Sequence, residues 1–105
     1  MHLTSYLQDG TLTIVLTGEI DHHCAKHYIQ SITSKIEAYK PQICVLDFQE
    51  VTFMDSSGIA VVINTLRNIT KIEGKLEISG LNPQPLKVFR ASGIEKIVNI
   101  KEEIK

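Results

Sequence analysis

The sequence has 105 residues and a mass of 11.8 kDa, which suits one domain over residues 1–105 rather than two. Eleven basic against twelve acidic residues leave a net charge of -1, so neither nucleic acid nor an anionic membrane is an expected partner. The longest apolar run, Gly58–Ile63, is far shorter than the roughly 20 residues that span a bilayer. The N-terminus has no signal-peptide pattern, and we expect a cytoplasmic protein.

Cys24 and Cys44 are the only cysteines, and their spacing matches neither a zinc pair nor a redox CxxC motif. We expect two reduced thiols, as in most intracellular proteins. A domain of this size buries only about 60–65% of its unfolded surface, which leaves little room for a deep catalytic cleft. A site on the surface is therefore expected.

The chain is predicted to open with a β-hairpin. Asp9-Gly10 favours a two-residue type I′ turn, in which both residues have positive φ. Gly18 is predicted to end the second strand. The turn sets a register with one mostly apolar face, in which Leu3 faces Leu16, Ser5 faces Ile14 and Leu7 faces Leu12.

A helix and a strand are predicted next. Asp21 is the expected N-cap, and Pro41 lies just beyond the C-terminal end. The continuous apolar run Ile43–Leu46 indicates a central parallel strand that is buried on both faces. Residues spaced by four, three, four and three form the apolar face of the helix: Ala25, Ile29, Ile32, Ile36 and Tyr39.

The remaining chain predicts two more helix–strand pairs. The second helix is expected to start near Ser57, and Leu76 and Ile78 alternate with polar residues as in a strand near the sheet edge. The second helix is expected to bury Ile59, Val62, Ile63, Leu66 and Ile69. In the third helix, Asn82-Pro83 forms the start, Leu86, Phe89 and Ala91 face inward, and Gly93 with Ile94 closes the C-terminal end. Residues 97–100 are predicted as the last strand and 101–105 as a frayed helical turn.

The predicted order is β-β-α-β-α-β-α-β. This alternation is typical of an α/β domain with helices packed against a mixed, mostly parallel sheet and right-handed crossovers. Binding sites in such sheets gather at the loops that follow the carboxyl ends of strands. Two predicted loops qualify here, namely residues 18–23 and residues 48–58.

The second loop joins a buried strand to a helix N-terminus, where unpaired N–H groups and the helix dipole favour an anion. Ser56 and Ser57 place two hydroxyls there, Gly58 leaves the first turn bare for a partner backbone, and Phe53 and Met54 are expected to plug into the core. From the residues alone, both a plain capping role and a functional hydroxyl remain open. The nucleophile-elbow and phosphate-loop motifs are both absent.

The first loop carries a charged run that ends in two histidines. His23 and His27 have a spacing that can bind a metal, but no further ligand is assured near them, and we expect no metal site. Glu19 and Asp21 are candidate acidic contacts for a basic partner. His22 and His23 are expected on the surface of the first helical turn.

Together the two loops resemble bacterial anti-sigma factor antagonists. The segments that carry the resemblance are Thr17-Gly18-Glu19-Ile20-Asp21-His22-His23 and Phe53-Met54-Asp55-Ser56-Ser57-Gly58. These antagonists belong to the superfamily named for sulphate transporters and anti-sigma factor antagonists (the STAS domain). The Asp-His-His run is most similar to the sporulation type. Asn82-Pro83 and Ser92-Gly93-Ile94 agree with the resemblance, which covers essentially the whole chain.

The resemblance implies a protein without catalysis or a cofactor of its own. The unphosphorylated form would bind an anti-sigma factor that is also a serine kinase, and sigma factor would be released. The kinase would phosphorylate Ser56 and break the complex, and a PP2C-type phosphatase would restore binding. The implied partner-binding residues are Glu19, Asp21, His22, His23, Asp55, Ser56, Ser57 and Gly58.

A phosphate on Ser56 adds about −1.5 to −2 charge beside acidic residues, while the helix N-terminus should tolerate it. In one departure from the family pattern, Ala60 occupies a position where members of this type often carry glycine.

Two alternatives stay open. The chain could be a stand-alone regulatory subunit of a transporter or lipid-trafficking complex, or a small-molecule enzyme or nucleotide binder that uses the two serines.

Overall fold

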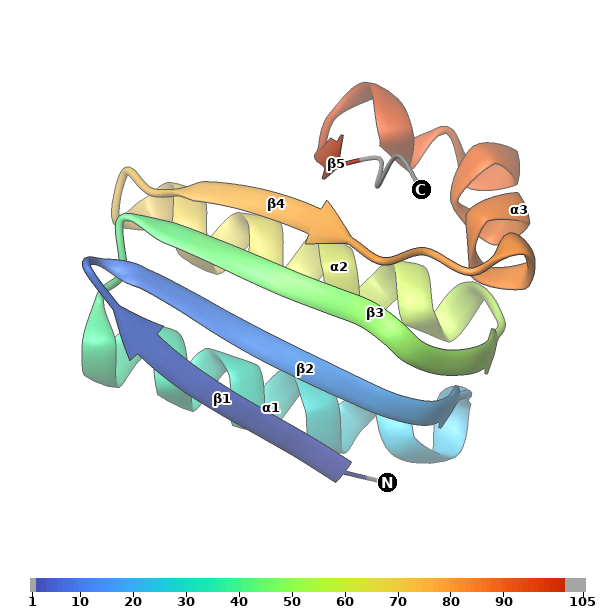
Figure 1. The fold of residues 1–105 in the computed structure, drawn as a ribbon, viewed down its shortest axis with the longest axis horizontal. Coiled ribbons are helices and arrows are strands. Elements are labelled where there is room, and N and C mark those ends of the chain that lie inside the picture. The colour runs from blue at the N-terminus through green and yellow to red at the C-terminus, as the bar shows by residue number, and fades with distance from the viewer. Residues whose placement is uncertain (1, 102–105) are drawn as a thin grey trace.

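The computed structural model describes residues 2–101 and confirms the predicted element order (Figure 1). One five-stranded sheet is accompanied by three α-helices and a short 3-10 helix, η1. The strands are β1 (His2–Gln8), β2 (Thr11–Ile20), β3 (Ile43–Met54), β4 (Lys75–Ser79) and β5 (Asn99–Lys101). The helices are α1 (His22–Tyr39), α2 (Ser56–Lys71), α3 (Pro83–Ser92) and η1 (Ile94–Lys96).

The strands lie in the order in which they occur in the chain, with β1 antiparallel to β2 and every later pair parallel. The predicted hairpin is confirmed: Leu3 pairs with Leu16 and Leu7 with Leu12, and Asp9 has the positive φ of a type I′ turn. The last strand begins later than predicted, because Ile97 closes η1 and is 62% exposed. The prediction of a helical turn over residues 101–105 is wrong at Lys101, which belongs to β5. The other residues of that turn lie outside the described residues.

The helices lie against one face of the sheet and leave the other face uncovered (Figure 1). Burial therefore alternates along β3, where Cys44, Leu46 and Phe48 are fully buried while Ile43 and Val45 are only half-buried. The prediction that this strand is buried on both faces is wrong. A continuous apolar run does not by itself show whether both faces are covered.

The apolar faces of α1 and α2 differ in part from the prediction. Tyr39 is the last residue of α1 and is 52% exposed. Tyr28 is buried instead, and its hydroxyl donates a hydrogen bond to the Thr17 carbonyl at 2.9 Å. In α2, Ile63 and Leu66 are only half-buried. Thr65 is buried, and its hydroxyl is satisfied by the Val61 carbonyl at 2.8 Å.

The third helix buries a narrower face than predicted. Phe89 is fully buried and meets Phe48 edge to face, with ring centroids 5.5 Å apart. Pro85 is also buried, whereas Leu86 is half-buried and Ala91 is exposed. Gly93 ends the helix in the left-handed conformation and Ile94 is buried behind it, as predicted.

Both central strands are longer than predicted. β3 continues from Leu46 to Met54, and β2 passes Gly18 and ends at Ile20. The register of the pairing shifts between Val15 and Thr17 and again after Gly18, and the two strands stay paired on both sides of each shift. The predicted loop over residues 48–58 is therefore mostly strand and helix.

We expect Gly80→Ala to destabilise the fold more than the same change at Gly93. Both glycines have positive φ, +72° and +76°, where an alanine costs roughly 1–2 kcal/mol. A Cβ at Gly80 would also lie 2.8 Å from the Gln49 nitrogen, whereas nothing lies within 4 Å at Gly93. Urea unfolding should show an additional loss of about 1–3 kcal/mol for Gly80→Ala. Equal losses in the two variants would contradict this packing.

Candidate functional site

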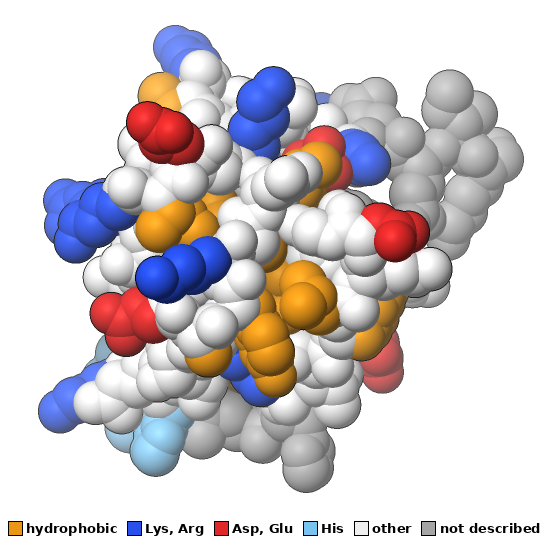
Figure 2. Space-filling model, turned by 90° about the vertical axis from the view of Figure 1, so that its left-hand side faces the viewer, with side chains coloured by type: hydrophobic (Ala, Val, Ile, Leu, Met, Phe, Trp, Pro, Cys, Tyr) orange, Lys and Arg blue, Asp and Glu red, His pale blue; other side chains and the backbone are white. Residues whose placement is uncertain are grey.

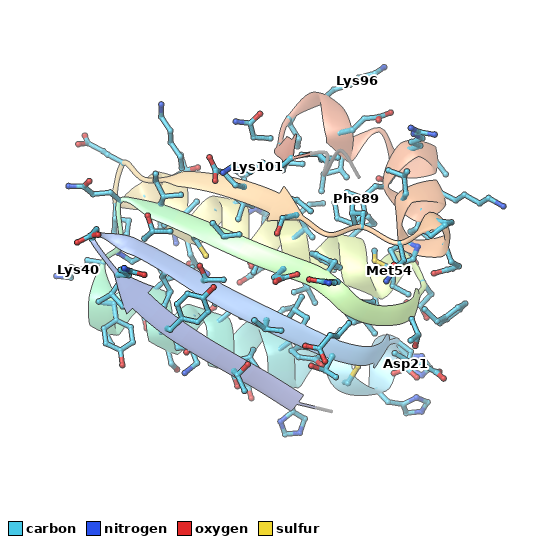
Figure 3. The ribbon with its side chains drawn as sticks, viewed as in Figure 1. Asp21, Lys40, Met54, Phe89, Lys96 and Lys101 are labelled. Atoms are coloured by element: carbon cyan, nitrogen blue, oxygen red, sulfur yellow. The ribbon has the colours of Figure 1, made fainter. Side chains whose placement is uncertain are left out.

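The N-termini of α1 and α2 lie side by side at one end of the sheet. The Asp55 nitrogen donates to the Ile20 carbonyl at 3.2 Å, immediately after the last β2–β3 pair, Ile20 with Met54. Figure 3 shows Asp21 and Met54 at this same end. The two predicted loops are therefore neighbours, and the acidic residues Glu19, Asp21 and Asp55 belong to one region.

Asp21 caps α1 as predicted. Its Oδ1 accepts from the His23 nitrogen at 2.9 Å and from the Cys24 nitrogen at 3.3 Å, and the His23 ring nitrogen lies 3.7 Å from Oδ2. Desolvation raises the pKa of Asp21, but these two N–H groups and the charge of His23 lower it by more, so the pKa lies below the usual 3.8. Asp21 is therefore engaged by its own helix.

Asp55 caps α2 in the same way, with its Oδ1 accepting from the Ser57 nitrogen at 2.7 Å. The helix starts at Ser56, one residue before the predicted start at Ser57. Because the aspartate supplies the cap, neither serine hydroxyl is needed for it. Ser56 is exposed on the first turn, and Ser57 is half-buried.

Gly58 faces the interior of the protein rather than solvent. A Cβ at this position would lie 2.6 Å from the Met54 terminal methyl carbon and 3.2 Å from the Met54 Cβ. Gly58 is buried, as is Met54. The expectation that Gly58 leaves room for a partner backbone is therefore wrong, because the side chain of Met54 fills that space.

Phe53 points the other way from Met54. The prediction that both residues plug the core is wrong for Phe53, whose side chain is 42% exposed. Neighbouring residues of a strand face opposite sides, so only one of the pair can point toward the helices. Phe53 thus adds an exposed aromatic ring next to the end of β3.

Two amide side chains hold the end of β3 where β4 has stopped. Gln84 accepts from the Met54 nitrogen at 2.8 Å and donates to the Met54 carbonyl at 2.9 Å, as a paired strand would. Asn82 donates to the carbonyls of Gln49 and Val51 at 3.0 and 2.9 Å. Sequence reasoning identified Asn82 only as an N-cap, and its side chain makes no capping bond to α3.

The outer surface of the site combines acidic, aromatic and small groups. Its exposed residues are Glu19, His22, His23, Phe53, Ser56 and Ala60. The rings of the two histidines lie 4.0 Å apart, and the Cys24 thiol beneath them is buried and donates to the Glu19 carbonyl at 3.3 Å. Among residues 2–101, no three His, Cys, Asp or Glu side chains are placed to hold a metal ion.

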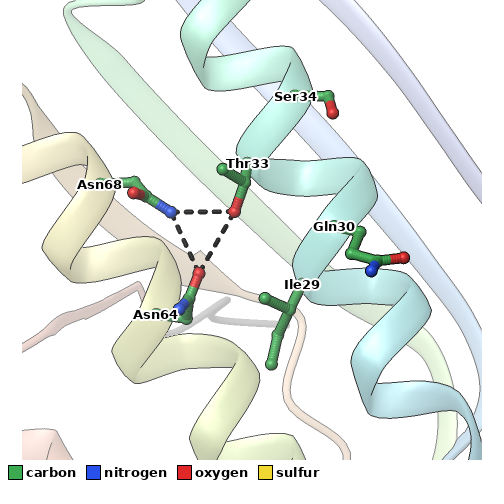
Figure 4. A pocket seen from close by; sticks show the side chains of 6 residues that line it. All are labelled: Ile29, Gln30, Thr33, Ser34, Asn64 and Asn68. Carbon is green, nitrogen blue, oxygen red and sulfur yellow. Dashed lines mark hydrogen bonds between the residues drawn. The ribbon is translucent and has the colours of Figure 1, made fainter.

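Away from this site, a concavity of about 490 Å³ lies between α1 and α2 (Figure 4). Three of its polar side chains bond to one another: Asn68 donates to Thr33 and Asn64 at 3.0 Å, and Thr33 donates to Asn64 at 3.2 Å. The lining residues are Ile29, Gln30, Thr33, Ser34, Asn64 and Asn68. These side chains are neutral and non-titrating, so they offer no acid–base or metal chemistry.

The other cysteine, Cys44, is buried in β3, and burial raises the pKa of its thiol to about 12. Cys44 is therefore an unreactive core residue at neutral pH. In the described part of the chain, the helices are too short or too polar to cross a membrane.

Comparison with known proteins relates this chain to STAS domains. The family model described as STAS domain matches residues 2–105. The anti-sigma F factor antagonist of Paenibacillus polymyxa is 30% identical over 91 residues, covering 87% of this chain and 78% of that protein. The Bacillus cell fate determinant SpoIIAA in its phosphorylated form is 26% identical with a TM-score of 0.72, covering 97% of this chain and 93% of that chain. An anti-sigma factor antagonist from Mycobacterium paratuberculosis has a TM-score of 0.87 at 21% identity, covering 98% and 86%, and supports the fold.

We expect Gln84→Ala to loosen the end of β3. The change removes two hydrogen bonds to Met54, which together are worth about 1–3 kcal/mol of unfolding free energy. Hydrogen exchange at the Met54 amide should accelerate, and urea unfolding should shift to lower concentration. Gln30→Ala is the matched control, because Gln30 is an exposed helical glutamine on α1. Equal stability and equal Met54 exchange in both variants would contradict the proposed role of Gln84.

Proposed function

The chain belongs to the STAS domain family, and from this premise we propose that it is an anti-sigma factor antagonist. In its unphosphorylated form it binds an anti-sigma factor, which releases the sigma factor. Support comes from relatives that carry this name and from the site itself. The observation on which the proposal rests most is the exposed Ser56 on the first turn of α2, beside a cap supplied by Asp55.

The regulatory step is phosphorylation of Ser56 by the anti-sigma factor, acting as an ATP-dependent serine kinase. The Ser56 oxygen attacks the γ-phosphorus of ATP, its proton is lost, and ADP leaves. A PP2C-type phosphatase hydrolyses the phosphoserine with water and returns the hydroxyl. The antagonist is a substrate in both steps, and an exposed serine on the first turn of a helix suits that role.

The phosphate acts through local charge. It adds about −1.5 to −2 charge at a helix N-terminus, where the dipole favours an anion and the fold can accept it. Asp55 is adjacent in sequence, Glu19 lies near the end of the neighbouring strand β2, and Asp21 follows that strand. A partner surface packed on neutral Ser56 would then meet an unpaired buried charge, which weakens binding without refolding.

The partner-binding surface in this proposal combines one aromatic residue with polar residues. Phe53 supplies an exposed ring of the kind that anchors protein interfaces. Gly58 contributes indirectly, by letting Met54 set the position of the first turn of α2. The surrounding contacts are Glu19, Asp21, His22, His23, Asp55, Ser56 and Ser57.

We expect a cognate anti-sigma kinase with ATP to transfer phosphate to Ser56. Mass spectrometry should place one phosphate there, and Ser56→Ala should abolish the transfer because the accepting oxygen is gone. Ser57→Ala is the matched control: Ser57 is the next residue on the same turn, and its nitrogen rather than its hydroxyl is bonded to Asp55. Transfer that persists in Ser56→Ala, or is lost only in Ser57→Ala, would refute the assignment.

We further expect Ser56→Asp to weaken binding of the anti-sigma factor by about 30- to 1,000-fold, equivalent to roughly 2–4 kcal/mol. The thermal unfolding midpoint should stay within a few degrees of the original value, because a carboxylate is tolerated on the first turn. Calorimetric titration and thermal unfolding measure the two quantities. A variant that binds normally, or one that unfolds, would show that Ser56 is not a local switch.

A further inference from the structure

Within residues 2–101, strand β1 forms a free edge of the sheet with none of the usual protection against pairing (Figure 1). Its seven residues include no Lys, Arg, Asp, Glu or Pro, and its pairing with β2 has no register shift. Natural edge strands are normally blunted by charges, prolines or bulges. The edge of β1 is therefore a template for another strand.

The hairpin geometry fixes which backbone groups face outward. The two-residue turn at Asp9-Gly10 makes Gln8 and Thr11 a hydrogen-bonded pair, and hydrogen-bonded and non-hydrogen-bonded pairs alternate from there. Three residues of β1 then direct their N–H and C=O groups away from β2. They are Leu3, Ser5 and Leu7.

The side chains of the same residues provide an apolar projection and a recess to receive it. Leu7 is 46% exposed on the side of the sheet that carries the helices, since its cross-strand partner Leu12 is buried there. Near the start of the same strand, a cleft of about 310 Å³ separates β1 from α1. The cleft is lined by Leu3, His27, Tyr28, Ser31 and Lys35.

We propose that two copies of the protein pair through β1 in antiparallel register, with the two-fold axis at Ser5. Ser5 then faces the partner's Ser5, and Leu3 faces the partner's Leu7, giving about six backbone hydrogen bonds. The partner's Leu7 enters the cleft beside Leu3, and Leu7 enters the equivalent cleft of the partner. On the opposite side of the sheet, the exposed Tyr6 lies across from the partner's Thr4.

Self-complementarity favours a second copy over another protein. Leu3 and Leu7 lie two residues on either side of Ser5, so a single two-fold axis fills both clefts at once. The strand carries no Asp, Glu, Lys or Arg, so no like charges of these residues oppose each other across the pair. Lys35 lines the cleft with a long aliphatic stem that can cover an apolar neighbour.

The proposed dimer leaves the candidate site accessible. Pairing of β1 with β2 ends at Thr17, before Glu19 and the N-termini of α1 and α2. Both copies of Ser56 therefore stay exposed, and this inference stands independently of the proposed function. An interface built on one short strand is smaller than a typical stable one, so the association should be reversible.

Sedimentation equilibrium of the purified full chain tests the association. Between about 10 µM and about 1 mM, the range expected for a small reversible interface, the mass should rise from 11.8 kDa toward twice that value. Leu7→Lys should weaken dimerisation at least about tenfold, because it places a charge in the partner's cleft. Thermal unfolding of the dilute variant checks that it is folded.

Ile97→Lys is the matched control, because Ile97 is 62% exposed and closes η1, which leads into β5 at the opposite edge of the sheet. It should dimerise like the original protein. A mass that stays at 11.8 kDa at the highest concentration would overturn the proposal. So would a dimer that Ile97→Lys disrupts and Leu7→Lys does not.

A cysteine cross-link tests the register without relying on Leu7. In the proposed pairing the two Ser5 Cα atoms lie about 5.5 Å apart, within disulfide range. Mild oxidation should link Ser5→Cys into a dimer that a reductant reverses, while the native Cys24 and Cys44 are buried. Thr4→Cys should link far less, since it faces the partner's Tyr6. Equal linking of both variants, or none, would refute the two-fold axis at Ser5.

Discussion

The extended pairing of β2 with β3 brings the parts of the site together. Both strands run past the end of β4, and the bond from the Asp55 nitrogen to the Ile20 carbonyl fixes their ends together. Each strand leads directly into a helix, so two helix N-termini become neighbours. The unsupported side of β3 is completed by Asn82 and Gln84, whose amides replace the strand that is missing there.

The site separates the groups that maintain the fold from the groups that face outward. Asp21 and Asp55 accept the first N–H groups of their helices, and Met54 packs against Gly58 beneath them. Ser56 and Phe53 are then left on the surface. A change in charge at such a serine alters what the surface can bind while the caps stay in place. That separation is what a signalling protein needs if modification is to be reversible.

The two ends of the sheet carry surfaces with different chemistry. Apolar side chains gather between charged ones at the end where β1 and α1 finish (Figure 2), and Leu7 and Tyr39 are exposed in those elements. The candidate site lies at the opposite end of β2 and β3. Pairing through β1 would join two such sites into one particle, so a partner with two binding surfaces would gain from their high effective concentration.

Local turn chemistry and periodicity were enough to predict the element order, the Asp9-Gly10 hairpin register and the cap at Asp21. The sequence also indicated the two neighbouring segments that carry the site. The folded chain was needed to show that β3 reaches Met54, that Phe53 is exposed, and that Met54 fills the space beside Gly58. The role of Gln84, whose amide pairs with the Met54 backbone as a neighbouring strand would, could not be predicted either. The reach of β3 and the role of Gln84 depend on contacts between residues distant in sequence, and the contact of Met54 with Gly58 depends on how β3 turns into α2.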